Sequence, residues 1–168
     1  MWICAARRFV GRTFHGDFAV PRPITVQIKR VGKADVALPV RMTQEAAGFD
    51  VAAAVDEAVT LAPGEIRVIP CGFAMAIPKG YEAQMRPRSG LASRHGITLV
   101  NTPGTIDSDY RGEVRVPLIN LGPSPFVVER GMRIAQMLVM PVPKVRLVEV
   151  DELDHTPRGA GGFGHTGQ

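Results

Sequence analysis

Cysteine is scarce in this chain, and no long apolar run occurs in it. The two cysteines, Cys4 and Cys71, cannot build a disulfide framework or a zinc site with four cysteine ligands. No stretch approaches the ~20 apolar residues that a membrane-spanning helix requires. The composition therefore argues against a small disulfide-rich fold and against a helical membrane-spanning protein.

Stretches free of both glycine and proline are short as well. The 168 residues contain 18 glycines and 14 prolines, and the longest stretch without either is the 14 residues 49–62. Proline removes a helix hydrogen bond and glycine lowers helix propensity, which excludes long helices, coiled coils and helical bundles. With 45% hydrophobic and 21% charged residues, the chain can bury the core of one domain.

Positive charge is concentrated at one end. The net charge is +4, and residues 1–23 carry +3 of it, from four arginines against Asp17. Residues 24–168 hold 16 basic and 15 acidic side chains, so specific nucleic-acid binding is not expected of this main part. The basic leader, residues 1–23, could be a mitochondrial transit peptide, a mis-assigned start or residues added by cloning. Nucleic-acid binding by the leader alone is a further alternative.

From residue 24 onward, short segments with period-two alternation are separated by turns. Ile24, Val26 and Ile28 alternate with polar residues, and further apolar runs cover residues 126–128, 134–142 and 145–150. This pattern predicts eight or more short strands in an all-β jelly roll or related barrel.

Only one short helix is expected. It covers residues 89–95, with Ser89 at the N-cap and Gly96 past the end. Residues 49–62 are rich in alanine, but their valines lie among turn-forming residues, so we expect mostly strand there.

Two segments have residues suited to an anionic ligand and to proton transfer. In residues 86–92 a turn leads into a helix start after Arg86 and Arg88, and free N–H groups there favour an anion; the alternative is an ordinary capped turn. In residues 101–113, Pro103 and Gly104 predict a hairpin tip, and Asp107 near Tyr110 is a candidate general base. The alternative is a surface hairpin with a salt-bridged rim.

Three further segments are ambiguous when taken alone. Arg158 and Phe163 stand isolated among the glycines of the tail, which predicts either a flap that closes over a ligand or a disordered linker. The segments around Asp50 and around residues 133–137 are equally compatible with core strands that each contain one polar residue.

Taken together and in order, these five segments resemble the trimeric all-β dUTPase family over residues 24–168. The matching motifs are AGFD, PRSGLA, NTPGTIDSDYRGE, RIAQ and RGAGGFGHTG. The resemblance implies a distorted jelly-roll barrel with one short helix, divided into leader 1–23, barrel 24–155 and a mobile Gly-rich tail 156–168 that closes the active site. His165 stands where the family usually has serine.

The family hydrolyses dUTP to dUMP and pyrophosphate, which limits uracil incorporation into DNA and supplies dUMP for dTMP synthesis. The resemblance implies that Asp107 activates a water for in-line attack on the α-phosphate. It also implies a Mg²⁺ ion bound mainly by the triphosphate, with Asp50 contacting it through water.

The resemblance further assigns the substrate contacts. The phosphates would be bound by Arg88, Ser89, Gly90, Gln136 and Arg158. Uracil would be read by residues Asn101, Gly104, Thr105 and Ile106 and covered by Phe163, with Gly164 and Thr166 in the closing tail. The ring of Tyr110 would pack under the deoxyribose and exclude a 2′-hydroxyl.

The expected assembly is a homotrimer with shared active sites, without membrane association and in the cytoplasm of a bacterial-type cell, unless residues 1–23 direct it to an organelle. Two other functions stay open. A dCTP deaminase has a similar fold, but it lacks the Asp-Ser-Asp-Tyr segment and uses a glutamate in place of Asp107. A non-catalytic relative that acts through regulation should have lost catalytic residues, whereas all five motifs are intact here.

Overall fold

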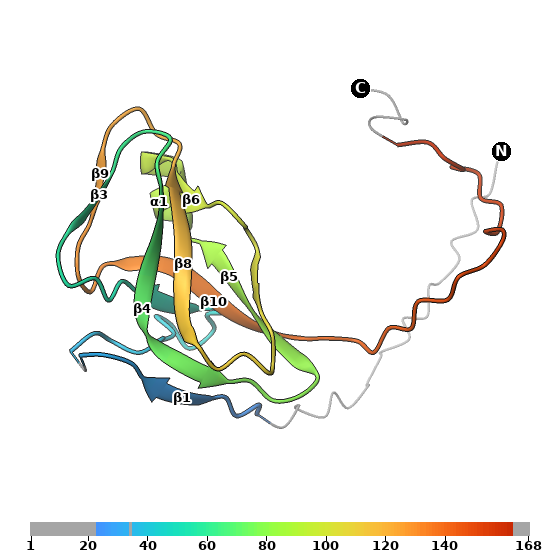
Figure 1. Ribbon diagram of the computed structural model, residues 1–168, viewed down its shortest axis with the longest axis horizontal. Helices are drawn as coiled ribbons and strands as arrows, with labels where there is room; N and C mark the ends of the chain where they lie inside the picture. The colour runs from blue at the N-terminus through green and yellow to red at the C-terminus, as the bar shows by residue number, and fades with distance from the viewer. Residues whose placement is uncertain (1–22, 34, 163–168) are drawn as a thin grey trace, which may run out of the picture.

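The computed structural model describes residues 23–33 and 35–162, which form an antiparallel β-barrel with one short helix (Figure 1). Most of the leader, residues 1–22, therefore lies outside the described residues. The elements in chain order are β1 Gln27–Arg30, β2 Phe49–Ala52, β3 Val59–Leu61, β4 Ile66–Ala76, β5 Tyr81–Pro87, α1 Ser89–His95, β6 Ile97–Leu99, β7 Gly104–Ile106, β8 Glu113–Asn120, β9 Phe126–Val128 and β10 Arg133–Pro141.

The strands form three antiparallel sheets around one core. Their orders are β1-β4-β8-β6, β2-β10-β5-β7 and β3-β9. Alternate residues of β8, namely Val114, Val116 and Leu118, are buried, as the period-two pattern predicts. The largest buried side chains of the core include Leu61, Ile69, Phe73, Ile97, Leu99 and Ile134. The predicted all-β barrel is thus confirmed.

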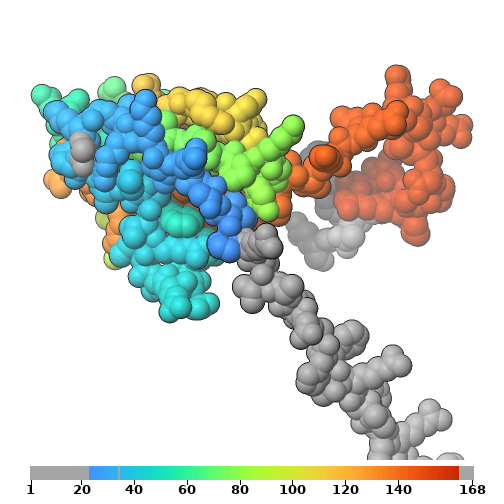
Figure 2. Space-filling model, turned by 90° about the horizontal axis from the view of Figure 1, so that it is seen from below, coloured from blue at the N-terminus to red at the C-terminus, as the bar shows by residue number. Residues whose placement is uncertain are grey.

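Residues 142–162 form an arm without helix or strand, and the predicted strand over 145–150 is wrong. The arm leaves the barrel after β10, and Figure 2 shows it in orange and red standing clear of the body. Its apolar side chains are exposed, Leu147 by 93% and Val145 by 73%. A strand needs a partner for its backbone groups, and residues 145–150 have none within the described residues of their own chain.

Residues 49–62 contain β2 and β3 at their two ends, which confirms strand over helix there. Helix α1 has the predicted bounds, but Ser89 is not its N-cap. Arg88 holds that position with extended backbone, and its carbonyl accepts from the N–H groups of Leu91 and Ala92. Gly96 ends the helix as predicted, with a left-handed φ of 68° that glycine adopts without strain. No helix in residues 23–33 and 35–162 is long and apolar enough to cross a membrane.

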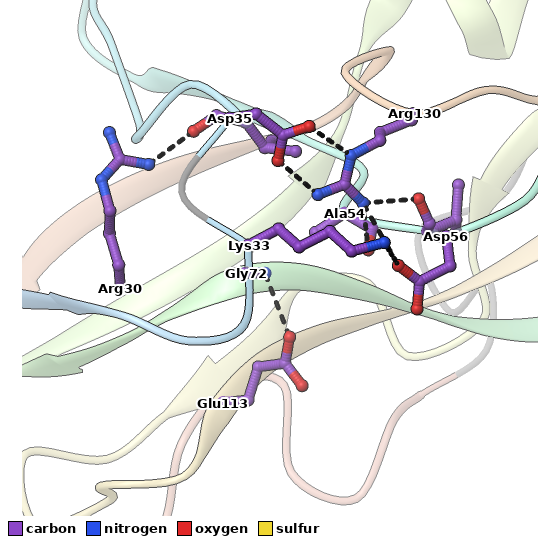
Figure 3. A network of polar contacts seen from close by, with 10 residues as sticks. Arg30, Lys33, Asp35, Ala54, Asp56, Gly72, Glu113 and Arg130 are labelled. Atoms are coloured by element: carbon purple, nitrogen blue, oxygen red, sulfur yellow. Dashed lines mark hydrogen bonds and ion pairs between the residues drawn. The ribbon is translucent and has the colours of Figure 1, made fainter.

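An ion-pair network centred on Arg130 fastens the loop after β1 to the barrel (Figure 3). The guanidinium of Arg130 binds both carboxylate oxygens of Asp35 at 2.9 and 2.5 Å and donates to the carbonyls of Ala54 and Val55. Lys33 pairs with Asp56 at 2.8 Å beside it. The hydrogen bond from Arg130 lowers the pKa of Asp35 to about 2. This network holds the segment after β2 against the turn that precedes β10.

Candidate active site

Three of the predicted motifs meet at the carboxylate of Asp50. Asp50 on β2 lies directly opposite Gln136 on β10, and Gln136 lies opposite Arg86 on β5. Nε2 of Gln136 donates to Oδ1 of Asp50 at 3.1 Å. Arg88, which follows β5, places Nη2 3.4 Å from Oδ2 of the same carboxylate. The sheet therefore brings the predicted Asp50, Gln136 and Arg88 into one cluster.

Arg133 joins this cluster, although the sequence did not identify it as a site residue. Its Nη1 donates to Oδ2 of Asp50 at 2.9 Å, and its carbonyl accepts from Nη1 of Arg88 at 3.0 Å. Residues 133 and 136 of a regular strand point to opposite faces. A register shift between Arg133 and Ala135 changes this, because a bulge re-aims the side chains on either side of it. The only sequence feature that could have indicated Arg133 as a site residue is its place at the start of the RIAQ motif.

The buried state of Asp50 explains why it needs these partners. Its side chain is only 4% exposed, and an isolated charge at such a site is costly. Two guanidinium groups face this one carboxylate, so one positive charge is left in excess at the edge of the sheet. The cluster of Asp50, Arg88, Arg133 and Gln136, hereafter the cradle, is suited to an anion.

Ser89 and Gly90 form the first two residues of α1, immediately after Arg88. An added Cβ on Gly90 would lie 3.0 Å from Nη2 of Arg94, at the end of an exposed side chain. The predicted phosphate-binding residues Arg88, Ser89 and Gly90 therefore lie consecutively beside the cradle.

A second part of the site lies on β7 and the loop that follows it. Thr105, Ile106, Asp107 and Tyr110 line one cavity of about 220 Å³, together with Val114 and Arg115. Its volume is below the ~300–1,000 Å³ usual for small-molecule pockets. We call this cavity the aspartate cavity; neither Asp50 nor Arg88 lines it.

The predicted hairpin at Pro103 and Gly104 is wrong. Strand β6 pairs with β8, whereas β7 pairs with β5 in the other sheet, so residues 100–103 cross between sheets. Gly104 starts β7 opposite Met85, and an added Cβ there would lie 3.1 Å from Nδ2 of Asn101. The turn nevertheless brings the side chain of Asn101 against Gly104.

The cradle and the aspartate cavity lie apart within one chain. Ile106 is opposite Ala83 on β5, whereas Arg88 follows the far end of that strand. Strand residues advance ~3.3 Å each, so residues 83 and 88 are separated by ~16 Å. Asp107 lies one residue farther still from Arg88. One chain thus carries two separate half-sites, the cradle and the aspartate cavity.

The tail residue Arg158 does not reach either half-site. Its Nε donates to the carbonyl of Gly161 at 2.8 Å, and Gly159 bonds back to Thr156. The end of the arm lies away from the barrel in both views (Figures 1 and 2). Phe163, Gly164 and Thr166, and also His165, lie outside the described residues.

The described ranges contain no group of three or more His, Cys, Asp or Glu side chains arranged for a metal ion. In the cradle, Oδ2 of Asp50 accepts from Arg133 and forms an ion pair with Arg88 at 3.4 Å, and Oδ1 accepts from Gln136. One acceptor position on Oδ1 remains for a water molecule. The residues therefore fit a Mg²⁺ ion that takes its direct ligands from a phosphate chain and water, and they do not fit a metal held by protein ligands alone.

The fold and the two half-sites define an all-β barrel with an arginine-rich cluster at Asp50 and a separate cavity at Asp107. The dUTPase family profile matches residues 34–167. A deoxyuridine 5′-triphosphate nucleotidohydrolase of Rhizobium etli is 52% identical over 158 residues, 92% of this chain and 99% of that protein. One from Desulfotalea psychrophila is 59% identical over 132 residues, 79% and 88% of the two chains. The chain therefore belongs to the dUTPase family.

Solved structures give the same result for the fold. The dUTPase of Staphylococcus bacteriophage 80alpha with dUPNHPP superposes with a TM-score of 0.76 at 27% identity, covering 86% of this chain and 99% of the phage chain. The family assignment and the jelly-roll fold predicted from the five motifs are thus confirmed.

Proposed function

We propose that this chain hydrolyses dUTP to dUMP and pyrophosphate, in active sites that each combine the cradle of one chain with the aspartate cavity of another. The observation that carries the proposal is the pairing of an arginine-rich cradle at Asp50 with a separate cavity lined by Asp107 and Tyr110. Membership of the dUTPase family supports the choice of dUTP as substrate.

Asp107 is the general base of the proposed reaction. It lies at the end of β7 and lines the aspartate cavity, where a carboxylate can orient a water molecule and accept its proton. The water attacks the α-phosphorus in line, and the pyrophosphate leaves on the opposite side. General-base help of this kind contributes roughly 10²–10⁴-fold to the rate.

The cradle binds the triphosphate. Its excess positive charge matches the polyanion, and the guanidinium of Arg88 is pre-aligned by Asp50 and by the carbonyl of Arg133. Ser89, Gly90 and Gln136 add neutral donors on the same side. Because Asp50 fixes the two arginines before substrate arrives, the cradle needs little reorganisation during the reaction.

Residues 101–106 read the base, and Tyr110 reads the sugar. Strand β7 is pinned to β5 through the pairs Gly104–Met85 and Thr105–Gln84, so its backbone groups have fixed positions. A site that hydrogen-bonds uracil leaves buried groups unpaired when cytosine binds, which can reduce turnover by 10⁴–10⁵-fold. The ring of Tyr110 packs under the deoxyribose and excludes a 2′-hydroxyl.

A Mg²⁺ ion bound to the triphosphate would be contacted by Asp50 through water at the free position on Oδ1. When bound, Mg²⁺ supplies charge neutralisation of the phosphate oxygens. Asp50 has its own task without the ion, because it orients Arg88 and Arg133.

A homotrimer with shared sites accounts for the two half-sites of each chain. Their ~16 Å separation along β5 is too large for Asp107 and Arg88 of one chain to act on one phosphate chain. The exposed apolar arm, with Leu147 and Leu153 at 93% and 86% exposure, supports donation of residues 142–168 to a neighbouring chain. Arg158 then binds the γ-phosphate, Phe163 stacks on uracil, and Gly164 and Thr166 complete the closed tail. The boundaries 1–23, 24–155 and 156–168, the cytoplasmic location and the supply of dUMP for dTMP synthesis stay predictions.

A nucleotide panel with pyrophosphate detection tests the proposed function. The full chain with Mg²⁺ is given dUTP, dTTP, dCTP and UTP, and pyrophosphate and ammonia are both measured. We expect pyrophosphate release with strong preference for dUTP. Ammonia release from dCTP would identify a deaminase instead. Absence of pyrophosphate from dUTP would leave a non-catalytic, regulatory protein.

A further inference from the structure

The φ angle of Gly112 gives no reason for the residue to be glycine. Its φ does not lie in the left-handed region, unlike that of Gly72, Gly96 and Gly131. A left-handed backbone therefore does not explain the glycine. The position must therefore be explained by space rather than by conformation.

The space is occupied by the ring of Tyr110. A Cβ added to Gly112 would lie 2.7 Å from Cζ and 3.1 Å from Cε2 of Tyr110, and it would meet Oη more closely still. All three of these nearest atoms belong to the same side chain. The ring of Tyr110 thus packs directly against Gly112.

The loop around this contact is fixed at both ends. Oη of Tyr110 donates to the carbonyl of Glu113 at 3.0 Å, and the N–H of Tyr110 bonds to the carbonyl of Asp107 at 3.1 Å. Glu113 is held in turn, because its Oε1 accepts from the N–H of Gly72 at 3.1 Å (Figure 3). That N–H is available because the β4–β8 register shifts between Pro70 and Ala74.

The side chain of Tyr110 is the part of this loop that can move. Tyr110 is 45% exposed, whereas Asp107 adjoins the paired strand β7 and Glu113 begins β8. A methyl group at position 112 would therefore displace the ring and leave the backbone around Asp107 in place. Both Tyr110 and Asp107 line the aspartate cavity. Displacement of the Tyr110 ring would therefore change the shape of the cavity and leave the carboxylate of Asp107 in place.

We propose that Gly112 is a specificity-determining residue: by having no side chain, it lets the ring of Tyr110 lie where it distinguishes deoxyribose from ribose. The proposal rests on the proposed function, in which Tyr110 packs under the sugar. Gly112 itself touches no substrate and acts by positioning Tyr110.

The test is a double-mutant cycle of Gly112→Ala and Tyr110→Ala, with kcat and KM measured separately for dUTP and UTP. In the otherwise unchanged chain, Gly112→Ala should lower the dUTP-to-UTP ratio of kcat/KM at least about tenfold, which corresponds to ~1.4 kcal/mol of lost discrimination. In the Tyr110→Ala background, Gly112→Ala should change the ratio no further, because contacting residues are not additive. Equal losses for the two nucleotides, or the same effect in both backgrounds, would overturn the proposal.

Urea unfolding of the same four proteins gives a readout that does not depend on turnover. Gly112→Ala should lower the urea midpoint when Tyr110 is present. With Tyr110→Ala it should leave the midpoint unchanged or raise it slightly, since alanine reduces the entropy of the unfolded chain. If the wild-type chain does not hydrolyse dUTP, the proposed function is refuted. The contact between residues 110 and 112 is still tested by the midpoints, and additive midpoint shifts would refute it.

Discussion

Arg133 donates a hydrogen bond from Nη1 to Oδ2 of Asp50 over 2.9 Å, and this carboxylate is almost fully buried. The bond joins β10 to β2 at the point where the register shifts. Arg88 contacts the same oxygen from a third strand end at 3.4 Å. The anion cradle is therefore held together from within by a buried acidic residue.

Removal of Arg133 should destabilise the protein and weaken phosphate binding. Arg133→Met leaves the buried Asp50 with fewer charged donors, so the free energy of unfolding should fall by about 1.5–3 kcal/mol. Urea unfolding at fixed chain concentration measures this. Lys29→Met on the exposed strand β1 is the control. A loss no larger than that of the control would show that Arg133 does not support Asp50.

The pair of Asp35 and Arg130 should contribute stability that depends on pH. Arg130 lowers the pKa of Asp35 from 3.8 to about 2, so the folded state favours the charged carboxylate. A lowered pKa stabilises the fold above the unfolded pKa, and the contribution is lost as pH falls through the folded value.

Asp35→Asn should therefore lower the urea midpoint at neutral pH, and its gap to the unchanged chain should narrow between about pH 4 and pH 2. Glu45→Gln, at an exposed position outside the arm, serves as the control. A gap that stays constant, or widens, in acid would contradict the assigned role of Asp35.

Asp107→Asn should separate binding from turnover. Asparagine keeps the shape of the side chain but cannot accept the proton of the attacking water. We expect dUTP binding to persist while kcat falls by roughly 10²–10⁴-fold. Asp109, which does not line the aspartate cavity, supplies the comparison, and Asp109→Asn should retain far more turnover. Near-normal kcat in Asp107→Asn would remove Asp107 from its role as base.

Truncation after Thr156 should leave the barrel and its assembly intact. The removed residues include Arg158, whose hydrogen bond runs to Gly161 within the tail rather than to the barrel. Light scattering should report the mass of three truncated chains, as the proposed trimer predicts, and the rate of dUTP hydrolysis should be greatly reduced. An unfolded or dissociated product would mean that the tail is structural.

The sequence predicted the barrel well because apolar alternation records burial directly. Val114, Val116 and Leu118 point inward as their spacing requires, and Gly96 ends α1 because few other residues tolerate its left-handed φ. Burial does not determine pairing, however. The hairpin predicted at Pro103 fails because the chain changes sheet there.

The difference between burial and strand pairing also explains the other predictions that failed or were missed. Residues 145–150 form an apolar run that predicted a strand, yet they have no backbone partner among the described residues of their own chain. Knowledge of the assembly would be needed to predict their structure. Arg133 was missed because a register shift, not periodicity, aims it at Asp50. Four of the five motifs supply the cradle and the aspartate cavity. The resemblance implied active sites shared between chains, and the strand register shows how far apart one chain keeps these two parts.

Mixing two inactive variants tests the shared site most directly. Asp107→Asn keeps an intact cradle, and Arg88→Ala keeps an intact aspartate cavity. If each active site takes these parts from different chains, the two variants, unfolded together and refolded as a mixture, should recover a substantial fraction of dUTP hydrolysis. Each variant refolded alone is the control and should stay inactive. A mixture no more active than its components would contradict the account.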